Sequence, residues 1–473
     1  MMLIVVKNAS SGIFVLISTF YSGKFMLKRT LMKRLIIEDL IKWKNSENRK
    51  PIILNGARQV GKTWILKEFG KNYYSDFAYF NCDGNEDLRQ IFSNGYNIQT
   101  ILMNLEALHG KYLKGDILIV FDEVQEIPNV LTSLKYFYEE RPDLHIAVAG
   151  SLLGLSLHNG TGFPVGKVDI LNISPMSFSE FILAIKGEML YEHLTKTALG
   201  QFGILHNQYT ELLRQYYFVG GMPEAVQAFV NGRSLEEIRQ IQNSILYAYN
   251  KDISKHSEPR ETIRIHQVWQ SIPQQLAKEN KKFIYGAIRH GARAKDFEVA
   301  IQWLLDAGLV VKVNRIKKAT IPLKFYEDTE AFKLFLLDCG LLGALSEAPA
   351  SEILGKSNNF EEYKGSFTEQ YVLGELSKLG YGSIYYFHAD DSKQELDFLV
   401  QDGKHVIPIE VKAEENLRAK SLRFFCLDHP ETKGIRISLS PYREQEWIVN
   451  LPLYAVNRIK DVDVTTKDTV DIS

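Results

Sequence analysis

Residues 51–63 read PIILNGARQVGKT, and this stretch decides the fold class of the N-terminal half of the chain. Its apolar first part, residues 51–55, predicts a short buried strand of a parallel sheet. Its second part has the spacing G-x-x-x-x-G-K-T, which is typical of a phosphate-binding loop between a strand and a helix. The loop contains Gly56, Ala57, Arg58, Gln59, Val60, Gly61, Lys62 and Thr63.

The residue types in this loop have a physical reason. Gly56 and Gly61 allow the backbone to wrap closely around phosphate oxygens, with N–H groups pointing inward beside the positive end of the following helix. We expect Lys62 to reach the β and γ phosphates of a bound nucleotide, and the Thr63 hydroxyl to ligate Mg²⁺. Residues 64–69 then read as a helix, which is the context that the motif requires.

A second apolar run, residues 116–121, predicts another buried strand and ends in Asp122 and Glu123. Ligands bind beyond the carboxyl ends of parallel strands, so both carboxylates should face the phosphate-binding loop. We expect Asp122 to hold Mg²⁺, directly or through water, and Glu123 to orient and deprotonate the attacking water. Taken alone, the Asp-Glu pair would more simply cap the next helix. The loop upstream favours the catalytic interpretation.

Two further apolar runs predict strands at residues 144–149 and 168–173. Ser151 follows the first of them, and two interpretations stay open: the hydroxyl senses the γ-phosphate, or it caps a helix that begins at Leu152. The alternation of strands and helices predicts an α/β fold, with the mostly parallel sheet of a P-loop NTPase and helices on both faces.

The chain has 473 residues, which corresponds to about three domains. Its 56 Lys and Arg residues balance 57 Asp and Glu residues, and 45% of all residues are hydrophobic. These values exclude a disordered chain, a coiled-coil rod and a polytopic membrane protein. The net charge of −1 excludes an overwhelmingly basic nucleic-acid binder but permits a local basic face. The 3 cysteines lie far apart and predict no disulfide framework, which suits the cytoplasm.

Residues 12–21 (GIFVLISTFY) are apolar but shorter than the roughly 20 residues of a membrane-spanning helix. They resemble the apolar region of a signal peptide, yet residues 22–25 (SGKF) form a poor cleavage site. We therefore treat residues 1–31 as an N-terminal extension outside the fold, with Met26 and Met32 as alternative starts. No membrane association is expected.

Several short motifs follow the loop in order. They are FDEVQE (121–126), LKY (134–136), AGS (149–151), PMSFSEF (175–181), GGMP (220–223), ELDF (395–398) and IEVK (409–412). This combination resembles prokaryotic AAA+-type ATP-binding proteins whose C-terminal half is a domain of uncharacterised function. The resemblance covers nearly the whole chain from Met32 onward. It implies ATP and Mg²⁺ as ligands and a helical lid on the nucleotide at residues 190–258.

Related proteins commonly carry an Arg just before the strand at residue 168, where this chain has Lys167. An arginine finger from a neighbouring subunit stabilises transition-state charge, and a Lys lacks the planar fork for that role. Arg58 and Arg141 remain alternatives, so self-association into a homo-oligomer stays open.

Residues 259–345 predict a winged helix. The pattern predicts helices and then two hairpin strands, at 263–276, 283–288, 294–307, 309–313 and 323–326. The third helix would place Arg293 and Lys295 near DNA phosphates. The hairpin loop adds three more cations, Arg315, Lys317 and Lys318. The same fold serves equally as a contact module for a protein partner.

Residues 346–473 predict an α/β domain with an acidic centre. A helix from Gly365 precedes strands at 384–388, 395–400 and 405–412. Glu410 and Lys412 are two positions apart in a strand and therefore share a face. Asp397 lies in the paired strand and should converge on them.

With Glu369 on the helix as a further ligand, this set is what a metal-dependent phosphodiesterase needs. The carboxylates of Asp397 and Glu410 hold Mg²⁺ while Lys412 positions the nucleophile. The arrangement resembles the restriction-endonuclease-like fold. Two alternatives stay open: Glu410 and Lys412 only pair with each other, or the domain is an inactive recognition module.

The sequence thus predicts five parts. They are an N-terminal extension (1–31), an AAA+-type P-loop ATPase core (32–189), a helical lid (190–258), a winged helix (259–345) and a restriction-endonuclease-like domain (346–473). We expect an ATPase that couples Mg-ATP hydrolysis to a DNA-related role. The competing hypothesis is an ATP-dependent regulatory switch that binds a protein partner and carries a catalytically inactive nuclease-like domain.

Overall fold

The structure of the chain is a computed structural model. It describes residues 32–151, 163–355, 361–390, 394–414 and 419–466, together with two short N-terminal strands. These strands, β1 (Ile4–Val6) and β2 (Phe14–Leu16), pair antiparallel within a unit formed by residues 1–32. Residues 33–473 form a second compact unit, to which everything below refers. Every helix among the described residues is too short or too polar to span a lipid bilayer.

The N-terminal sheet contains five parallel strands in the order β4-β5-β6-β3-β7. Their bounds are β3 (Ile52–Asn55), β4 (Asp76–Asn81), β5 (Ile117–Asp122), β6 (His145–Ala149) and β7 (Asp169–Asn172). The predicted parallel α/β sheet is confirmed. Strand β4 was missed, although its sequence DFAYFN has an apolar centre between Asp76 and Asn81.

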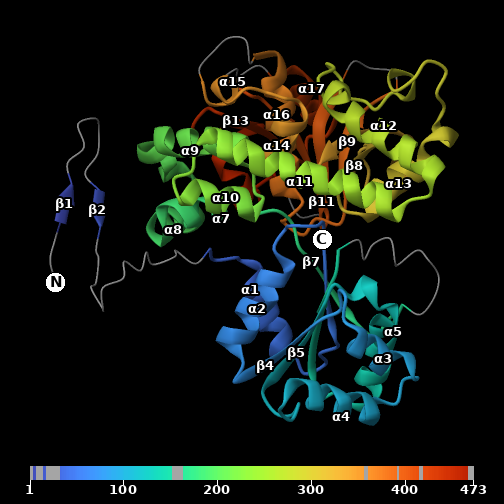
Figure 1. The fold of residues 1–473 in the computed structure, drawn as a ribbon. Helices are drawn as coiled ribbons and strands as arrows, with labels where there is room; N and C mark the ends of the chain where they lie inside the picture. The colour runs from blue at the N-terminus through green and yellow to red at the C-terminus, as the bar shows by residue number, and fades with distance from the viewer. Residues whose placement is uncertain are drawn as a thin grey trace, which may run out of the picture. The chain divides into compact units, whose positions relative to one another are not determined.

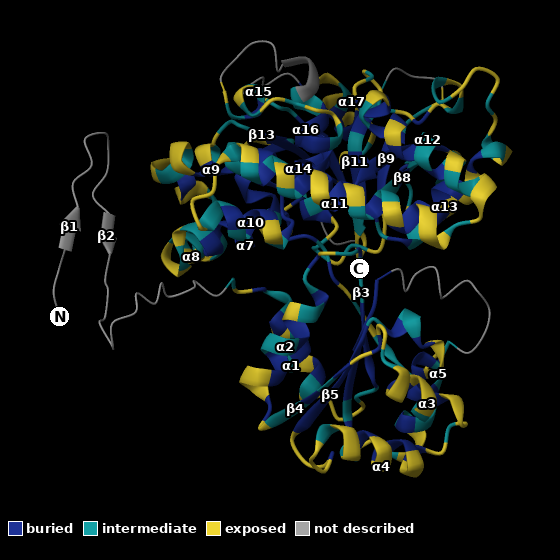
Figure 2. Ribbon diagram, viewed as in Figure 1, coloured by how far each residue is buried: buried dark blue, intermediate teal, exposed yellow. Residues whose placement is uncertain are grey.

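Helices cover both faces of this sheet, as Figure 1 shows, with α1 and α2 on one side and α3 and α5 on the other. The helices are α1 (Ile36–Lys44), α2 (Lys62–Tyr73), α3 (Glu86–Ser93), α4 (Ile98–His109) and α5 (Pro128–Glu140). The strands are mostly buried and the outer helix faces exposed (Figure 2). A continuous apolar core fixes the strand ends, where the functional residues lie.

A helical region follows, as predicted for residues 190–258. It begins with α7 (Phe178–Lys186) and continues with α8 (Glu188–Lys196), α9 (His206–Val219), α10 (Pro223–Val230) and α11 (Leu235–His256). The predicted turn at residues 220–221 separates α9 from α10. A Cβ added to Gly221 would lie 2.1 Å from the Met176 carbonyl oxygen, so a side chain does not fit there.

A second sheet of eight strands occupies the C-terminal half, in the order β14-β15-β13-β12-β11-β10-β8-β9. Its bounds are β8 (Val310–Ile316), β9 (Glu327–Leu336), β10 (Ile384–His388), β11 (Glu395–Asp402), β12 (His405–Val411), β13 (Gly434–Ser438), β14 (Arg443–Glu444) and β15 (Ile448–Pro452). Strands β8 and β10 pair in parallel, so the β8–β9 hairpin extends the C-terminal sheet across the predicted boundary at residue 345.

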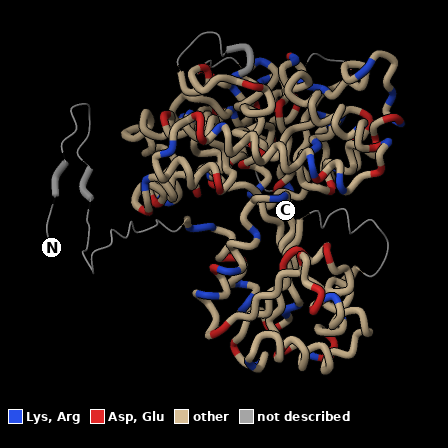
Figure 3. Tube along the Cα trace, in the orientation of Figure 1, with Lys and Arg blue, Asp and Glu red and all other residues tan. Residues whose placement is uncertain are grey.

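The helices around this sheet are α12 (Pro259–Leu276), α13 (Glu298–Asp306), α14 (Cys339–Leu345), α15 (Ala350–Leu354), α16 (Glu361–Leu376) and α17 (Lys420–Asp428). The long helix α12 continues past Pro273 to Leu276. Lys and Arg are mixed with Asp and Glu along most of the chain trace (Figure 3), which agrees with the near-zero net charge.

Three predictions for residues 259–345 are wrong in detail. Residues 323–326 form a short 3-10 helix, and the second hairpin strand is β9, whose half from Ala331 onward is buried. Only a 3-10 turn at 285–287 replaces the helix predicted at 283–288, because the Phe283 N–H donates to the Phe332 carbonyl and keeps the chain extended. The third helix starts at Glu298 rather than at 294.

Candidate functional site

The phosphate-binding loop connects β3 to α2 at the carboxyl edge of the sheet. Its backbone takes left-handed angles at Gln59 (φ 65°) and Gly61 (φ 98°). A Cβ on Gly56 would lie 2.3 Å from the Ile173 carbonyl oxygen, just after β7. Glycine at position 56 is therefore required for the loop to pass this close to the neighbouring strand.

Lys62 turns back into the loop. Its Nζ donates to the carbonyl oxygens of Gly56 at 2.7 Å and Ala57 at 2.8 Å, and the residue is 7% exposed. Burial lowers the pKa of this ammonium to about 8, against the opposing effect of the Glu123 and Asp122 carboxylates. The cation thus lies inside the loop and near both acids, held only by backbone carbonyls.

Asp122 lies at the end of β5 and accepts two hydroxyl groups on one oxygen. Thr63 Oγ1 donates to Asp122 Oδ2 at 2.7 Å, and the Tyr79 hydroxyl donates to the same atom at 2.8 Å. A carboxylate and a threonine hydroxyl in contact are the oxygen donors that Mg²⁺ prefers, so these residues fit the metal. Tyr79 was missed because its strand, β4, was missed.

Glu123 follows Asp122 in a left-handed backbone conformation with φ 51°. Gln125 Nε2 donates to Glu123 Oε2 at 2.6 Å and fixes the carboxylate. Ser151 is buried beyond the end of β6, the strand between β5 and β3. The helix predicted from Leu152 lies outside the described residues. The structure therefore brings the predicted loop, Asp122, Glu123 and Ser151 to one edge of one sheet.

Arg34 binds the backbone of the phosphate-binding loop, and the sequence analysis did not predict this contact. This residue is 5% exposed and donates to the carbonyl oxygens of Val60 and Ser174, both at 2.8 Å. Its Nε donates to Glu180 Oε1 at 3.0 Å. The spacing Ser177-x-x-Glu180 is a capping-box signature, so the start of α7 was readable in the sequence, although its link to the loop was not.

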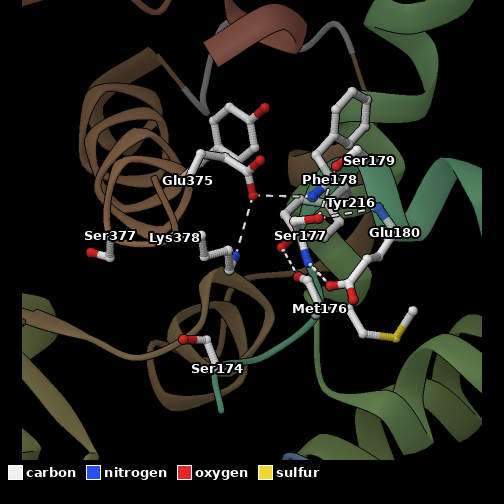
Figure 4. A network of polar contacts seen from close by, with 12 residues as sticks. Ser174, Met176, Ser177, Phe178, Ser179, Glu180, Tyr216, Glu375, Ser377 and Lys378 are labelled. Atoms are coloured by element: carbon white, nitrogen blue, oxygen red, sulfur yellow. Dashed lines mark hydrogen bonds and ion pairs between the residues drawn. The ribbon is translucent and has the colours of Figure 1, made fainter. Parts of the chain in front are cut away.

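The start of α7 joins the ATPase sheet to the C-terminal half, as Figure 4 shows. Ser177 and Glu180 form the capping box of α7. The Phe178 N–H donates to Glu375 Oε1 of α16 at 3.0 Å, and Lys378 Nζ lies 3.3 Å from the same oxygen. One carboxylate of α16 therefore satisfies a helix N-terminus that begins only a few residues after β7.

The three finger candidates lie in different surroundings. Arg58, in the loop, forms an ion pair with the buried Asp252 of α11, and the Tyr249 hydroxyl donates to the Arg58 carbonyl at 2.8 Å. Helix α11 thus contacts the loop. Arg141 binds Asp143 through two hydrogen bonds, and Lys167 lies 3.0 Å from Glu139.

Arg141 and Lys167 precede β6 and β7, at the amino edge of the parallel sheet and opposite the loop. Both therefore lie away from a nucleotide bound at the loop of the same chain.

The structure also brings the predicted C-terminal residues together. The Val411 N–H, between Glu410 and Lys412, donates to Asp397 Oδ2 at 2.7 Å. Lys412 Nζ lies 2.7 Å from Glu410 Oε1. Glu369 of α16 is buried near Asp397, and both are close enough to affect each other's pKa.

Two further lysines enter this centre, and neither gave a signal in the sequence. Lys281 Nζ lies 2.5 Å from Glu369 Oε1, and the buried Lys333 lies 2.9 Å from Glu395 Oε1 and 4.0 Å from Glu369 Oε2. Burial opposes the charge of Glu369, but these ammonium groups hold its pKa below the ordinary value. Burial and then Glu369 raise the pKa of Asp397 to about 7.

These contacts test whether the C-terminal centre fits a metal. Oε2 of Glu369 and Oε2 of Glu410 are buried without a hydrogen-bond partner among the described residues, as a cation site requires. However, Lys281 and Lys412 already form ion pairs with Glu369 and Glu410, two of the three predicted ligands. No group of three or more His, Cys, Asp or Glu side chains in the described part of the chain is arranged to hold a metal ion. As arranged, the residues do not fit the predicted metal site.

Comparison with known families agrees with the N-terminal geometry. Residues 48–182 match a family described as an AAA domain. Residues 210–352 and 364–455 match two domains of unknown function, DUF8612 and DUF4143. No curated protein matches the chain.

Three of the solved structures that the comparison found are the following. PCH-2 of C. elegans is 15% identical, with 40% of this chain and 56% of that chain covered and a TM-score of 0.25. The Orc1 protein of Aeropyrum pernix, solved with DNA, is 15% identical (66% and 91% covered, TM-score 0.25). Cdc6p of Pyrobaculum aerophilum is 14% identical (70% and 96% covered, TM-score 0.26). These scores are too low to carry a conclusion about function.

The phosphate-binding loop, the acidic pair and the match to the AAA domain agree with one another. Residues 48–182 form an AAA-type P-loop ATPase domain.

Proposed function

We propose that the chain binds ATP with Mg²⁺ at loop 56–63, hydrolyses it, and couples hydrolysis to a DNA-related role of its C-terminal half. The contact between Thr63 and Asp122, 2.7 Å long and beside Lys62, carries the proposal. It assembles the groups that a magnesium triphosphate needs, from a strand end and a helix start that are 59 positions apart in the sequence.

Each group has a distinct task in this mechanism. The loop N–H groups and Lys62 bind the phosphates, and Lys62 exchanges its carbonyl contacts for phosphate oxygens when nucleotide binds. Mg²⁺, when bound with the nucleotide, neutralises charge that develops on the phosphate oxygens. Glu123, oriented by Gln125, accepts a proton from the attacking water.

Coupling to the C-terminal half has a structural route. Arg34 binds the loop at Val60 and also binds Glu180 at the start of α7. The same helix start is bound by Glu375 of α16. A loop that moves on nucleotide binding therefore acts on contacts shared with the C-terminal half.

A second candidate is an ATP-dependent regulatory switch that binds a protein partner and cleaves nothing. The ion pairs of Lys281 with Glu369 and of Lys412 with Glu410 favour it, because they occupy two of the acids that a nuclease would use for metal. The predicted winged helix serves either candidate.

Phosphate release with and without duplex DNA tests the main proposal. We expect Mg²⁺-dependent turnover that DNA alters severalfold, and no turnover above background for Lys62→Ala. Lys71→Ala, exposed on the same helix, is the matched control. An inactive wild type would contradict ATP hydrolysis, and turnover indifferent to DNA would favour the switch.

A nuclease assay with Mg²⁺ or Mn²⁺ separates the two C-terminal interpretations. DNA cleavage by the wild type that disappears in Asp397→Asn would show that a metal displaces the lysines. Asp402→Asn, at the exposed last residue of β11, controls for a general loss of charge. Absence of cleavage in every variant would support the inactive domain.

A further inference from the structure

The loop between α12 and α13 carries a group of exposed cations. Residues 282–295 read KFIYGAIRHGARAK and contain four Lys and Arg residues but no acid. All four are exposed: Lys282, Arg289, Arg293 and Lys295. Among the described residues, none of them forms an ion pair, in contrast to most cations near the second sheet.

The hairpin that the sequence singled out for DNA is different. Arg315 lies 2.5 Å from Asp328 and 2.9 Å from Asp390, and Lys317 lies 3.5 Å from Asp328. These two cations are thus largely neutralised, and a phosphate would have to compete with carboxylates already in place. Of the three predicted hairpin cations, only Lys318 is exposed without an ion pair among the described residues.

The basic loop is anchored at the acidic centre. Lys281, immediately before it, binds Glu369 at 2.5 Å. The Phe283 N–H donates to the Phe332 carbonyl at 2.8 Å, next to Lys333 in β9. Gln275 of α12 binds both the N–H and the carbonyl of Ile284. The base of the loop is therefore fixed beside Glu369, while the cations from Arg289 onward lie in solvent.

We propose that loop 282–295 binds the phosphate backbone of duplex DNA and holds the duplex beside the acidic centre of Glu369 and Asp397. Exposed guanidinium and ammonium groups with no acid between them match a regular row of phosphates. The adjacent acid, Asp296, accepts the backbone N–H of Arg293. The residues between these cations, from Gly286 onward, are mostly glycine and alanine, which allow close approach. A protein partner would need a large apolar anchor, and this part of the loop exposes none. The inference rests on the proposed DNA-related role.

Fluorescence anisotropy with a labelled duplex of about 20 base pairs, at several KCl concentrations, tests the proposal. The loop variant is Arg289→Gln, Arg293→Gln and Lys295→Gln combined. The matched control neutralises three exposed hairpin lysines: Lys317→Gln, Lys318→Gln and Lys324→Gln. Losing three phosphate contacts should lower the slope of log K against log salt by about 2.7 and weaken binding on the order of 10²-fold near 0.1 M salt. The hairpin variant should change binding much less.

The outcomes distinguish the assignment of the loop from the DNA-related role. A loop variant that binds DNA like the wild type, or a hairpin variant that loses more affinity, overturns the loop assignment and leaves the DNA role intact. A wild type that binds no duplex overturns both, and binding to polyglutamate instead would identify an acidic protein as the partner. The rate of ATP hydrolysis without DNA should be the same in the wild type, the loop variant and the hairpin variant. Equal rates would show that each protein is folded.

Discussion

The two acid–lysine centres of this chain differ in how their charge is balanced. At the ATP site, Asp122 accepts hydrogen bonds from neutral donors, the hydroxyls of Thr63 and Tyr79 and the Glu123 N–H, and Lys62 donates to backbone carbonyls. At the C-terminal centre, Glu369 and Glu410 are already paired with lysine ammonium groups. Both centres have the residue types of a phosphate-processing site.

The comparison shows that composition alone does not define a metal site. A carboxylate held by neutral donors keeps its full charge for an incoming cation, whereas one in a buried ion pair has already exchanged water for an ammonium group. The first centre is thus arranged to receive a magnesium nucleotide. The second is arranged to be stable without a metal.

The largest effect should come from Glu123→Gln at the first centre. The amide keeps the shape but cannot accept the proton of the attacking water, so kcat for ATP should fall by about 10²–10⁴-fold. Nucleotide affinity should stay within about threefold, since Glu123 does not bind the phosphates. Steady-state phosphate release and nucleotide titration measure the two quantities. Glu140→Gln, exposed at the end of α5, is the control.

Removing the buried lysine of the second centre should cost stability instead. Lys333→Met leaves Glu395 and Glu369 short of a partner, and we expect the free energy of unfolding to fall by about 3–5 kcal/mol. Lys62→Met, at the first centre, should cost no more than about 1 kcal/mol, because burial already disfavours its charge. Urea denaturation measures both. Equal losses of unfolding free energy in the two variants would contradict the difference in charge balance between the two centres.

The affinity for nucleotide should fall at high pH. In the empty loop, burial lowers the pKa of Lys62 to about 8, and bound phosphates favour the ammonium form and raise that pKa. Affinity should therefore be level below pH 8 and then decline by up to about tenfold per pH unit above it. Titration of a fluorescent ATP analogue between about pH 7 and 10 measures the affinity. The ammonium and amine forms of Lys62 exchange over roughly this range. Lys62→Arg, always charged, should show no such decline.

The smallest effect concerns the residue that orients Asp122. Tyr79→Phe removes one hydrogen bond to Asp122 Oδ2, which is worth about 0.5–1.5 kcal/mol. The Mg²⁺ concentration for half-maximal ATP hydrolysis should rise by about two- to tenfold, with Mg²⁺-free nucleotide binding unchanged. Tyr112→Phe, at an exposed position, is the control. An unchanged Mg²⁺ requirement would mean that Thr63 alone positions the acid.

Much of the first centre could be predicted because its signals are local. The loop, the strand before it and the helix after it are contiguous, and Asp122 and Glu123 end an unmistakably apolar run. Tyr79 was not found, because no motif marks the short strand β4 or its position beside Asp122. Arg34 gave no signal either, because its partners Val60 and Glu180 are 26 and 146 positions away.

The sequence by itself determined the P-loop sheet, its nucleotide loop and its acidic pair, since short-range spacing and strand order place these groups together in any folded version of the chain. Only the tertiary structure decided the state of the second centre. Lys281 binds Glu369, which is 88 positions away in the sequence. Lys333 lies in the β8–β9 hairpin, which pairs with the C-terminal sheet. Ion pairing between such distant segments depends on packing, which residue types and spacing do not encode.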